Sequence, residues 1–400
     1  MIAESRTNPR WMVRLLISGL VMLGAIPLDV MLPSYPAMAM HFARPVSDVA
    51  WSISVFALGF AVAQLFVGPL SDHYGRKKIL IAALLVAAFG SGGAIFATDF
   101  HVFLAWRIIQ AAGCSTFVLA QAIVQDEFKG KEATRARIFI TSANGVLIAI
   151  SPVCGSVLQQ FFGWRGSFEL FVVISVGLVA VAGWKYAAPL PSRPASQAAR
   201  FYAAEYVRMF SDSPFVIYWL VGSIAFSCHF AFIVSSPLIF LEVMKMSATA
   251  FSAVLLLYGL AYVVAGVFAG KIIARISEQH AIYVGYGVIA AAGLVMFVLQ
   301  MAIGTSAAAI LVPMVLCTLG TSLVRPCAAS LAMARFSTSA GTASAAGSSI
   351  RMLVGGVVSG LTAALGHSVI ANLIGLLVMS SITCWLLLRV LAQKRTEVTA

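Results

Sequence analysis

The chain has 400 residues, of which 61% are apolar and only 10% are charged, and its mean hydropathy is +0.97. A soluble domain carries about 25% charged residues, so this chain has too little polar material to cover a soluble core of its size. The composition therefore excludes an ordinary soluble protein and indicates a chain embedded in a bilayer, where buried charges are costly.

Twelve hydrophobic segments follow one another along the chain. Each is about 20 residues or longer, which is the length that a hydrocarbon core of roughly 30 Å requires. Apolar runs this long lack the alternation of barrel strands, so each predicts a transmembrane helix. The predicted spans are 11–39, 46–70, 77–97, 101–125, 136–160, 166–187, 214–241, 248–272, 280–301, 305–333, 340–363 and 367–391. The expected fold class is an all-α membrane protein with twelve transmembrane helices.

Lysine and arginine are divided unevenly between the two sides of these spans. Of the 26 basic residues, three fall on one side and three within spans, which leaves the rest on the side of both termini. The positive-inside rule then places both termini in the cytoplasm, as an even number of spans also demands. The net charge of +12 is interpreted as a topology signal and an attraction to anionic lipid, rather than as a nucleic-acid footprint.

A polar stretch at residues 188–213 interrupts the series of spans after the sixth. Within it, Tyr202, Tyr206, Met209 and Phe210 fall on one face of a predicted helix, so we expect this helix to lie on the cytoplasmic membrane surface. The predicted organisation has three parts. These are an N-terminal six-helix bundle at 1–187, a cytoplasmic linker with a surface helix at 188–213, and a C-terminal six-helix bundle at 214–400.

The strongest local signal lies between the second and third spans, in the run Gly68-Pro69-Leu70-Ser71-Asp72-His73-Tyr74-Gly75-Arg76-Lys77-Lys78. Gly68 is expected to allow close helix approach, and Gly75 to permit a tight turn. Asp72 lies at a helix end beside the cations of Arg76 and Lys77. We expect these five residues to form a conformational latch that breaks and re-forms as two helix bundles rock. The alternative, which the charges alone would favour, is an ordinary basic loop on the cytoplasmic side with no role in conformational change.

This loop resembles that of the major facilitator superfamily, with His73 in place of the usual arginine. Two further runs are similar to the family's motifs. Arg107-Ile108-Ile109-Gln110-Ala111-Ala112-Gly113 matches the fourth span except at Ala111, and 145–155 resembles the fifth-span motif of proton-coupled antiporters except at Ser151. The resemblance implies two pseudo-symmetric six-helix bundles around a central cavity.

A closer resemblance is to the Bcr/CflA group of drug-proton antiporters. It is carried by Leu28-Asp29-Val30-Met31-Leu32-Pro33-Ser34-Tyr35-Pro36, and by the runs at 122–126 and 340–345. The resemblance implies a multi-pass protein of the bacterial inner membrane that functions as a monomer. It further implies that the export of small molecules is driven by the proton gradient, with no cofactor.

Asp29 is the only acidic residue well inside a predicted span, about 17 residues from the cytoplasmic start of the first. Burial favours the neutral acid and a nearby cation favours the anion, so a carboxyl between these influences can exchange protons. Arg107 has a similar expected depth. We predict that both residues take part in proton coupling. The alternatives are a polar residue at a helix kink for Asp29 and a static partner of Asp29 for Arg107.

Arg325 and Arg351 are expected at similar depth in the C-terminal half, where no acidic residue lies within a span. Because arginine keeps its proton, each guanidinium needs a carboxylate, carbonyls, water or a substrate. We predict a positively charged cavity wall that binds anionic substrates. The alternative is that both side chains extend toward the cytoplasmic surface.

Other polar residues within the spans are weaker candidates. His229 is a possible second proton site, although a lone histidine on an apolar helix is more often a hydrogen-bonded packing residue. Cavity-lining roles are predicted, with interhelical packing as the default for each, at Tyr35, Gln64, Gln121, Asn144 and Tyr258.

The leading functional hypothesis is a proton-coupled exporter of small amphiphilic or anionic compounds, drug-like or siderophore-like. One alternative is an importer of an anionic metabolite or metal chelate. Another is a membrane receptor or a channel, although no filter sequence is evident. The chain has no metal-ligand cluster, nucleophile elbow or phosphate loop in its sequence, so it is not predicted to be an enzyme.

Overall fold

The computed structural model describes residues 9–116, 119–120, 123–124, 127–128, 130–186, 195–365 and 368–399, and these are almost entirely helical. The elements are α1 (Arg10–Asp29), η1 (Leu32–Ser34), α2 (Tyr35–Phe42), α3 (Val46–Tyr74), α4 (Arg76–Phe96), α5 (Phe100–Cys114), α7 (Gly130–Phe162), α8 (Gly166–Lys185), α9 (Ala195–Ser211), α10 (Ser213–Pro237), η2 (Leu238–Val243), α11 (Ala248–Ile273), α12 (Glu278–Ile303), α13 (Ala307–Met333), η3 (Ala334–Ser339), α14 (Ala340–Ala364) and α15 (Val369–Thr399). Among the described residues, nine helical segments are long and apolar enough to span a membrane. Together with α5, α7 and α14, they make up the twelve expected spans.

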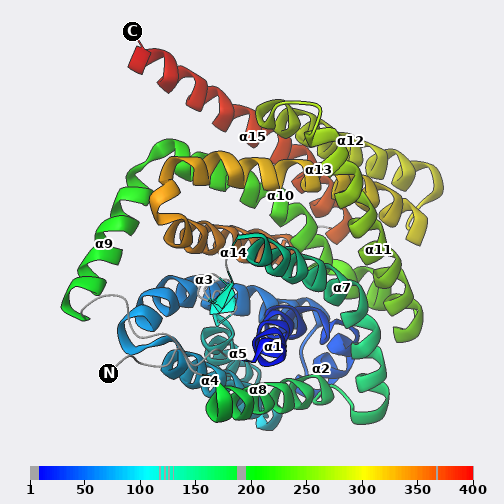
Figure 1. The fold of residues 1–400 in the computed structure, drawn as a ribbon. Coiled ribbons are helices and arrows are strands. Elements are labelled where there is room, and N and C mark those ends of the chain that lie inside the picture. The colour runs from blue at the N-terminus through cyan, green and yellow to red at the C-terminus, as the bar shows by residue number, and fades with distance from the viewer. Residues whose placement is uncertain are drawn as a thin grey trace, which may run out of the picture.

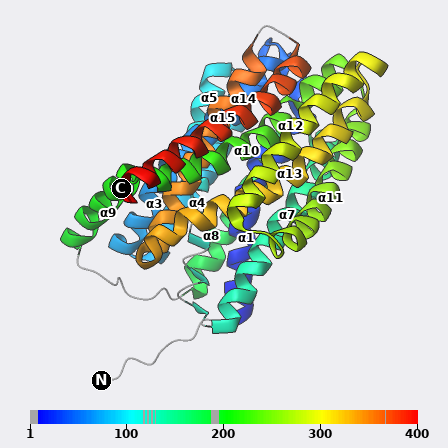
Figure 2. The ribbon, with the colours of Figure 1, turned by 90° about the horizontal axis from the view of Figure 1, so that it is seen from above.

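The helices form two bundles, one drawn in the lower half of Figure 1 and the other in its upper half. In the first bundle, α4 packs against α5 and α8, and α1 packs against α7 and α8. In the second, α10 packs against α13, α14 and α15, and α12 packs against α13 and α15. Figure 2 shows the same helices running roughly side by side along their length.

Two helix pairs join the bundles directly, α3 with α14 and α7 with α11. The hydroxyls of Ser54 and Ser359 lie 3.2 Å apart, and Ser252 donates to the Pro152 carbonyl at 2.9 Å. Ser54 and Ser252 lie near the starts of α3 and α11, whereas Pro152 and Ser359 lie toward the ends of α7 and α14. We call this end of the molecule the far end. The opposite end, at the junction of α3 and α4, is called the basic end.

The first span differs from the expected continuous helix at 11–39. It breaks after Asp29, continues through the short helix η1, and resumes as α2. Pro33 and Pro36 occupy the first turns of η1 and α2. Proline is tolerated there because the N–H groups of a first turn have no acceptor within the helix. The same prolines would interrupt the hydrogen bonds of a single long helix. The chain therefore has a helix end inside the first bundle, next to Asp29.

The sequence predicts that the linker helix α9 turns its aromatic face to the membrane surface. In the structure, most of that face contacts the protein instead. The Tyr206 hydroxyl donates to the Leu65 carbonyl of α3 at 3.2 Å, and Met209 is fully buried. Tyr202 binds Asp72, also on α3. Three residues of the face predicted to meet lipid therefore dock on the protein, where the two hydroxyls find hydrogen-bond acceptors, whereas Phe210 stays 44% exposed. α9 contacts both α3 and α14, so it bridges the two bundles, at the left of Figure 1.

An ion pair outside the spans ties the start of α10 to η3. Asp212 caps α10 by accepting from the Phe215 N–H at 2.8 Å, and it accepts two bonds of 2.6 Å from Arg335. Partial burial opposes the anion, but these donors outweigh it and hold the pKa of Asp212 below its ordinary value. The pair therefore stabilises the fold above about pH 4 and loses this effect as the carboxylate is protonated in acid.

We expect Asp212→Asn to lower the stability at pH 7 by no more than about 1 kcal/mol, since the Arg335 side chain is 43% exposed. Asparagine keeps the helix cap, so the difference reports the ion pair. Thermal unfolding in detergent from pH 7 to pH 3 is the measurement. The two proteins should converge as the pH falls, and a difference that stays constant would contradict the assignment.

Candidate functional site

Arg107, on α5, is fully buried in the first bundle. Its guanidinium donates to the Pro27 carbonyl of α1 at 2.8 Å and to the side-chain oxygen of Gln110. The Phe56 ring lies against it, with 4.5 Å from the guanidinium carbon to the ring centroid. This cation is thus held by neutral oxygen acceptors and an aromatic face.

The break in the first span explains why Arg107 finds an acceptor there. The last carbonyls of a helix have no partner within it, and they carry the negative end of the helix dipole. Pro27 lies in the last turn of α1, so its carbonyl is one of these groups. Arg107 therefore caps the end of a helix that terminates inside the bundle.

Asp29 is the last residue of α1, two positions beyond that carbonyl, and only 9% of it is exposed. None of the ion pairs among the described residues joins Asp29 to Arg107. The alternative in which Arg107 is the static partner of Asp29 is therefore wrong for this conformation. The guanidinium of Arg107, which comes from α5, binds the Pro27 carbonyl of α1 instead of the Asp29 carboxyl.

Gln110 positions Arg107 through a chain of contacts with α4. Its side-chain nitrogen donates to the Ser91 hydroxyl at 3.1 Å, and Ser91 donates to the Phe168 carbonyl at 3.1 Å. Gly90, beside Ser91, allows α4 to approach α5, because a Cβ there would lie 2.3 Å from the Gln110 backbone nitrogen. The fourth-span motif thus contributes a buried cation and the residue that orients it.

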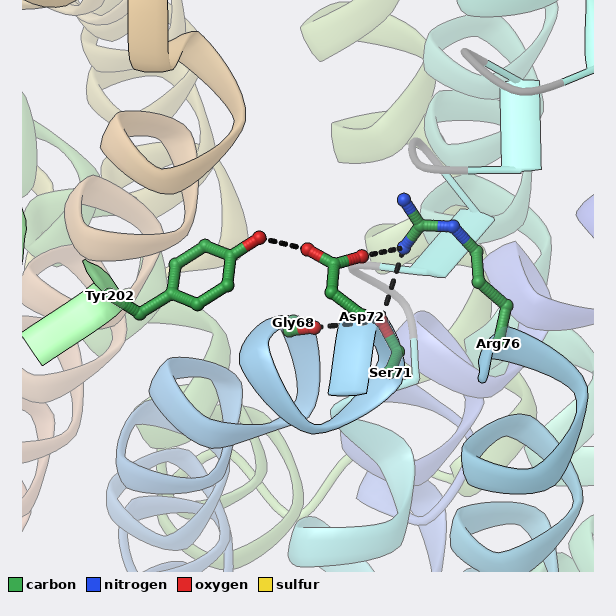
Figure 3. A network of polar contacts seen from close by, with 5 residues as sticks. All are labelled: Gly68, Ser71, Asp72, Arg76 and Tyr202. Carbon is green, nitrogen blue, oxygen red and sulfur yellow. Dashed lines mark hydrogen bonds and ion pairs between the residues drawn. The ribbon is translucent and has the colours of Figure 1, made fainter. Parts of the chain in front are cut away.

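The latch region lies at the basic end and is shown in Figure 3. Asp72 forms an ion pair of 3.1 Å with Arg76, and Arg76 also donates to the Ser71 hydroxyl at 3.1 Å. On its other side, Asp72 accepts a hydrogen bond from the Tyr202 hydroxyl of α9. The carboxylate therefore links the end of α3 to the start of α4 and to the linker helix.

The latch glycines and Lys77 have different surroundings. A Cβ on Gly68 would meet nothing within 4 Å, so the expected close helix approach there is wrong; its carbonyl instead accepts from Ser71. Gly75 has φ +94°, a conformation that L side chains rarely adopt, so it makes the turn between α3 and α4. Lys77 donates to the Gly183 carbonyl at 2.9 Å and so caps α8.

We expect Asp72→Asn and Tyr202→Phe to be energetically coupled. The double variant should lose less stability than the sum of the single variants by about 1–2 kcal/mol, since each change removes the same hydrogen bond to a charged group. Denaturant titration of the purified protein measures this coupling. Tyr206→Phe is the matched control, because Tyr206 binds the Leu65 carbonyl. Equal coupling for both tyrosines would disprove a specific contact.

In the second bundle, His229 on α10 shares a 2.6 Å hydrogen bond between its Nδ1 and the Tyr258 hydroxyl of α11. The rings of His229 and Tyr262 lie 5.1 Å apart. His229 is 6% exposed and Tyr258 only 1%. The structure thus gives His229 the hydrogen-bonded packing that the sequence offered as the alternative to a proton site.

Arg325 and Arg351 come together beside this cluster, on opposite helices α13 and α14. Arg325 donates to the Tyr262 hydroxyl at 2.5 Å, and Arg351 donates to the Ser348 hydroxyl at 3.2 Å. Their guanidinium carbons lie 5.1 and 5.7 Å from the centroid of one ring, that of Phe226. Both side chains therefore contact groups inside the bundle.

The other predicted lining residues divide into two groups. Tyr35 is fully buried, and Gln64 is 1% exposed. Gln121 lies outside the described residues, and Asn144 lies in α7 but its side chain is outside them as well. Tyr35 and Gln64 are thus packed between helices, and their cavity-lining role stays a prediction.

The sequence reasoning missed Tyr202, Tyr262 and Phe226. Tyr262 is four residues after Tyr258, and residues at this spacing share one face of a helix, so the spacing was an available signal. Phe226 lies three residues before His229 on the same helix, a weaker signal of the same kind. Nothing in the sequence links Tyr202 to Asp72, since 130 residues separate them.

Comparison with known proteins agrees with this architecture. The chain is 24% identical over 350 residues to a chloramphenicol resistance protein of Pseudomonas aeruginosa, covering 86% of this chain and 81% of that protein. It is 25% identical to multidrug resistance protein D of Escherichia coli strain K12, covering 93% and 94%. A bicyclomycin resistance protein homolog of Haemophilus influenzae is 26% identical, covering 56% and 57%.

The fold is also that of solved transporters. The crystal structure of a D-xylose-proton symporter superimposes with a TM-score of 0.73 at 14% identity, over 94% of this chain and 97% of that one. A partially occluded inward-open structure of the xylose transporter XylE from E. coli gives 0.71 at 13% identity, with the same coverage. At these identities the likeness establishes the fold alone.

The model of the family described as Major Facilitator Superfamily matches residues 15–360. The loop between α3 and α4 and the buried arginine of the fourth span belong to the motifs by which the sequence resembles that family. The protein therefore belongs to the Major Facilitator Superfamily, as a multi-pass membrane transporter of small molecules and not an enzyme.

Proposed function

We propose that this transporter exports small amphiphilic drugs, anionic ones included, from the cytoplasm in exchange for protons. The names of its relatives, which concern chloramphenicol, bicyclomycin and multidrug resistance, support a drug as the substrate. The uneven distribution of lysine and arginine supports a cytoplasmic position for the basic end. The siderophore-like substrate stays an alternative within the same proposal.

The observation that carries proton coupling is the position of Asp29 at the broken end of α1. A carboxylate in the interior of a membrane protein is costly unless a cation or water is beside it. Asp29 is almost fully buried and forms no ion pair with Arg107, which instead binds the Pro27 carbonyl. We propose that Asp29 takes up a proton while the far end is open, carries it into this conformation, and releases it toward the basic end, where the drug then binds.

Alternating access supplies the rest of the cycle. The contacts between the bundles at the far end, Ser54 with Ser359 and Ser252 with Pro152, support a conformation closed on that side. In the proposed cycle the drug enters from the basic end while the far end is closed. Rocking then breaks the far-end contacts and rearranges α9, which is bound to Asp72 of the latch.

Transport by purified protein in liposomes tests the proposal, with chloramphenicol as the probe. Chloramphenicol is uncharged near neutral pH, so a pH gradient does not trap it by ionisation. Antiport predicts that the drug accumulates when the liposome lumen is acidic, because protons leave as drug enters. Accumulation should disappear when nigericin collapses the gradient, and it should be absent from liposomes without protein.

The sign of the gradient separates the alternatives. An importer that moves its substrate with protons would accumulate chloramphenicol only when the lumen is alkaline. A channel would let the drug equilibrate without accumulation under either gradient. A receptor would bind the drug without moving it. Any of these three results would overturn the proposed exchange.

A further inference from the structure

We propose that Arg325 and Arg351 form a binding site for the carboxylate of an aromatic acid, with the ring of Phe226 as its apolar floor. This inference rests on the proposed export function, since it names a class of compound for that transporter to carry. We call the residues Phe226, Tyr262, Arg325, Ser348 and Arg351 the guanidinium cluster. They come from α10, α11, α13 and α14.

The first argument is the arrangement of two cations on one ring. The guanidinium carbons lie 5.1 and 5.7 Å from the Phe226 centroid, so the two groups are no more than about 11 Å apart and share one aromatic ring. Phe230 stacks on Phe226 at 5.1 Å between centroids, and Gly355 of α14 leaves room for both rings. The platform is therefore built from packed side chains and is not a chance meeting of flexible arginines.

The second argument is charge. None of the ion pairs within the described part of the chain includes Arg325 or Arg351. Two like charges that face the same ring repel each other, and an anion between them would relieve this repulsion. Their protein partners are the neutral hydroxyls of Tyr262 and Ser348. The cluster thus has positive charge that no carboxylate in the described residues compensates.

The third argument is an unsatisfied donor. The Arg351 Nε is buried and has no hydrogen-bond partner. A guanidinium normally uses its five N–H groups, and two of them on one edge match the two oxygens of a carboxylate. A buried donor left without an acceptor is unfavourable, so a carboxylate oxygen at this position would satisfy it.

The fourth argument is orientation on α14. Leu353, Val357 and Leu361 form an exposed apolar stripe at intervals of four residues, as expected of a lipid-facing surface. At 3.6 residues per turn, Arg351 lies about 120° around the helix from Val357, the middle of this stripe. The guanidinium therefore points away from lipid and toward α10, where it meets Phe226.

These features select the chemistry of the ligand. The carboxylate would be bound by the guanidinium groups, and an aromatic body would lie along Phe226 and Phe230. An amine would be repelled by two cations, and a small inorganic anion would leave the aromatic platform unused. An aromatic monocarboxylate satisfies both halves of the site.

Equilibrium dialysis of the purified full-length protein in dodecyl maltoside tests this site, with 2-naphthoate as the probe. We expect saturable binding to the wild type at neutral pH. Arg325→Gln and Arg351→Gln should each weaken binding at least roughly tenfold, because each removes charge-assisted hydrogen bonds. Arg351→Lys should retain more affinity than Arg351→Gln, since it keeps the charge.

Arg389→Gln is the matched control, because Arg389 stacks on Trp385 of α15 and lies outside the cluster. It should bind 2-naphthoate like the wild type, and thermal unfolding verifies that each variant is folded. The neutral isostere 2-naphthamide should bind much more weakly than the acid. Chloride at equal concentration should not displace the probe.

Several results would overturn the inference. These are the absence of saturable binding to the wild type, equal binding of the amide, displacement by equimolar chloride, or unchanged affinity in folded Arg325→Gln and Arg351→Gln proteins. Binding at equilibrium needs no gradient. Failure of this experiment is therefore distinct from failure of the chloramphenicol exchange described above.

Discussion

Asp29→Asn is expected to abolish the effect of a pH gradient on drug accumulation. Asparagine has nearly the shape of aspartic acid but cannot release a proton. No step of the transport cycle would then move a proton through the side chain at position 29. A gradient can shift a transport equilibrium only through differential proton binding, so the ratio of accumulation with and without the gradient should fall to about one. The chloramphenicol assay in liposomes measures this ratio.

Glu169→Gln provides the control for Asp29→Asn. Glu169 is a carboxylate in the first turn of α8 and is exposed, so its loss removes the same charge without touching the end of α1. It should retain the response to the gradient. If Asp29→Asn accumulated drug as the wild type does, Asp29 would have no role in coupling, and the exchange itself could still stand.

Gly90→Ala should be strongly damaging to the first bundle. The added Cβ would lie 2.3 Å from the Gln110 nitrogen and 2.7 Å from its Cα, both backbone atoms that cannot turn aside. α4 and α5 must then separate, at an expected cost of about 2–3 kcal/mol, typical of overpacking. The shift would also move Gln110, which binds Arg107, so transport should fall together with stability.

Gly92→Ala is the matched control, two residues along the same helix. A Cβ at Gly92 would meet nothing within 4 Å, and alanine is the better helix former by about 1 kcal/mol. Thermal unfolding in detergent should therefore show a lower midpoint for Gly90→Ala and an equal or higher one for Gly92→Ala. Equal loss in both variants would mean that the approach of α4 to α5 is not tight at Gly90.

The sequence was sufficient for the features that depend on neighbouring residues. The predicted span 248–272 corresponds to α11 at Ala248–Ile273, and 340–363 to α14 at Ala340–Ala364, because the length of an apolar run sets the length of a helix in a bilayer. The turn at Gly75 could also be predicted from local sequence, because a tight turn between two helices favours a glycine with positive φ.

The sequence could not show which polar groups meet. Arg107 binds a carbonyl 80 residues earlier in the chain, and it does so only because α1 ends after Asp29. The aromatic face of α9 looked lipid-facing because amphipathicity alone does not tell a membrane from a protein surface. Its tyrosines bind α3 because the fold brings Asp72 and the Leu65 carbonyl within reach.

By itself, then, the sequence determined the membrane class, the spans and the three unusual intramembrane arginines, because hydrophobicity and the cost of burying charge are properties of single residues and short segments. Only the tertiary structure decided that Arg107 caps a helix end and leaves Asp29 without an ion pair. It also decided that Arg325 and Arg351 share the Phe226 ring, since contacts between distant helices depend on the packing of the whole bundle.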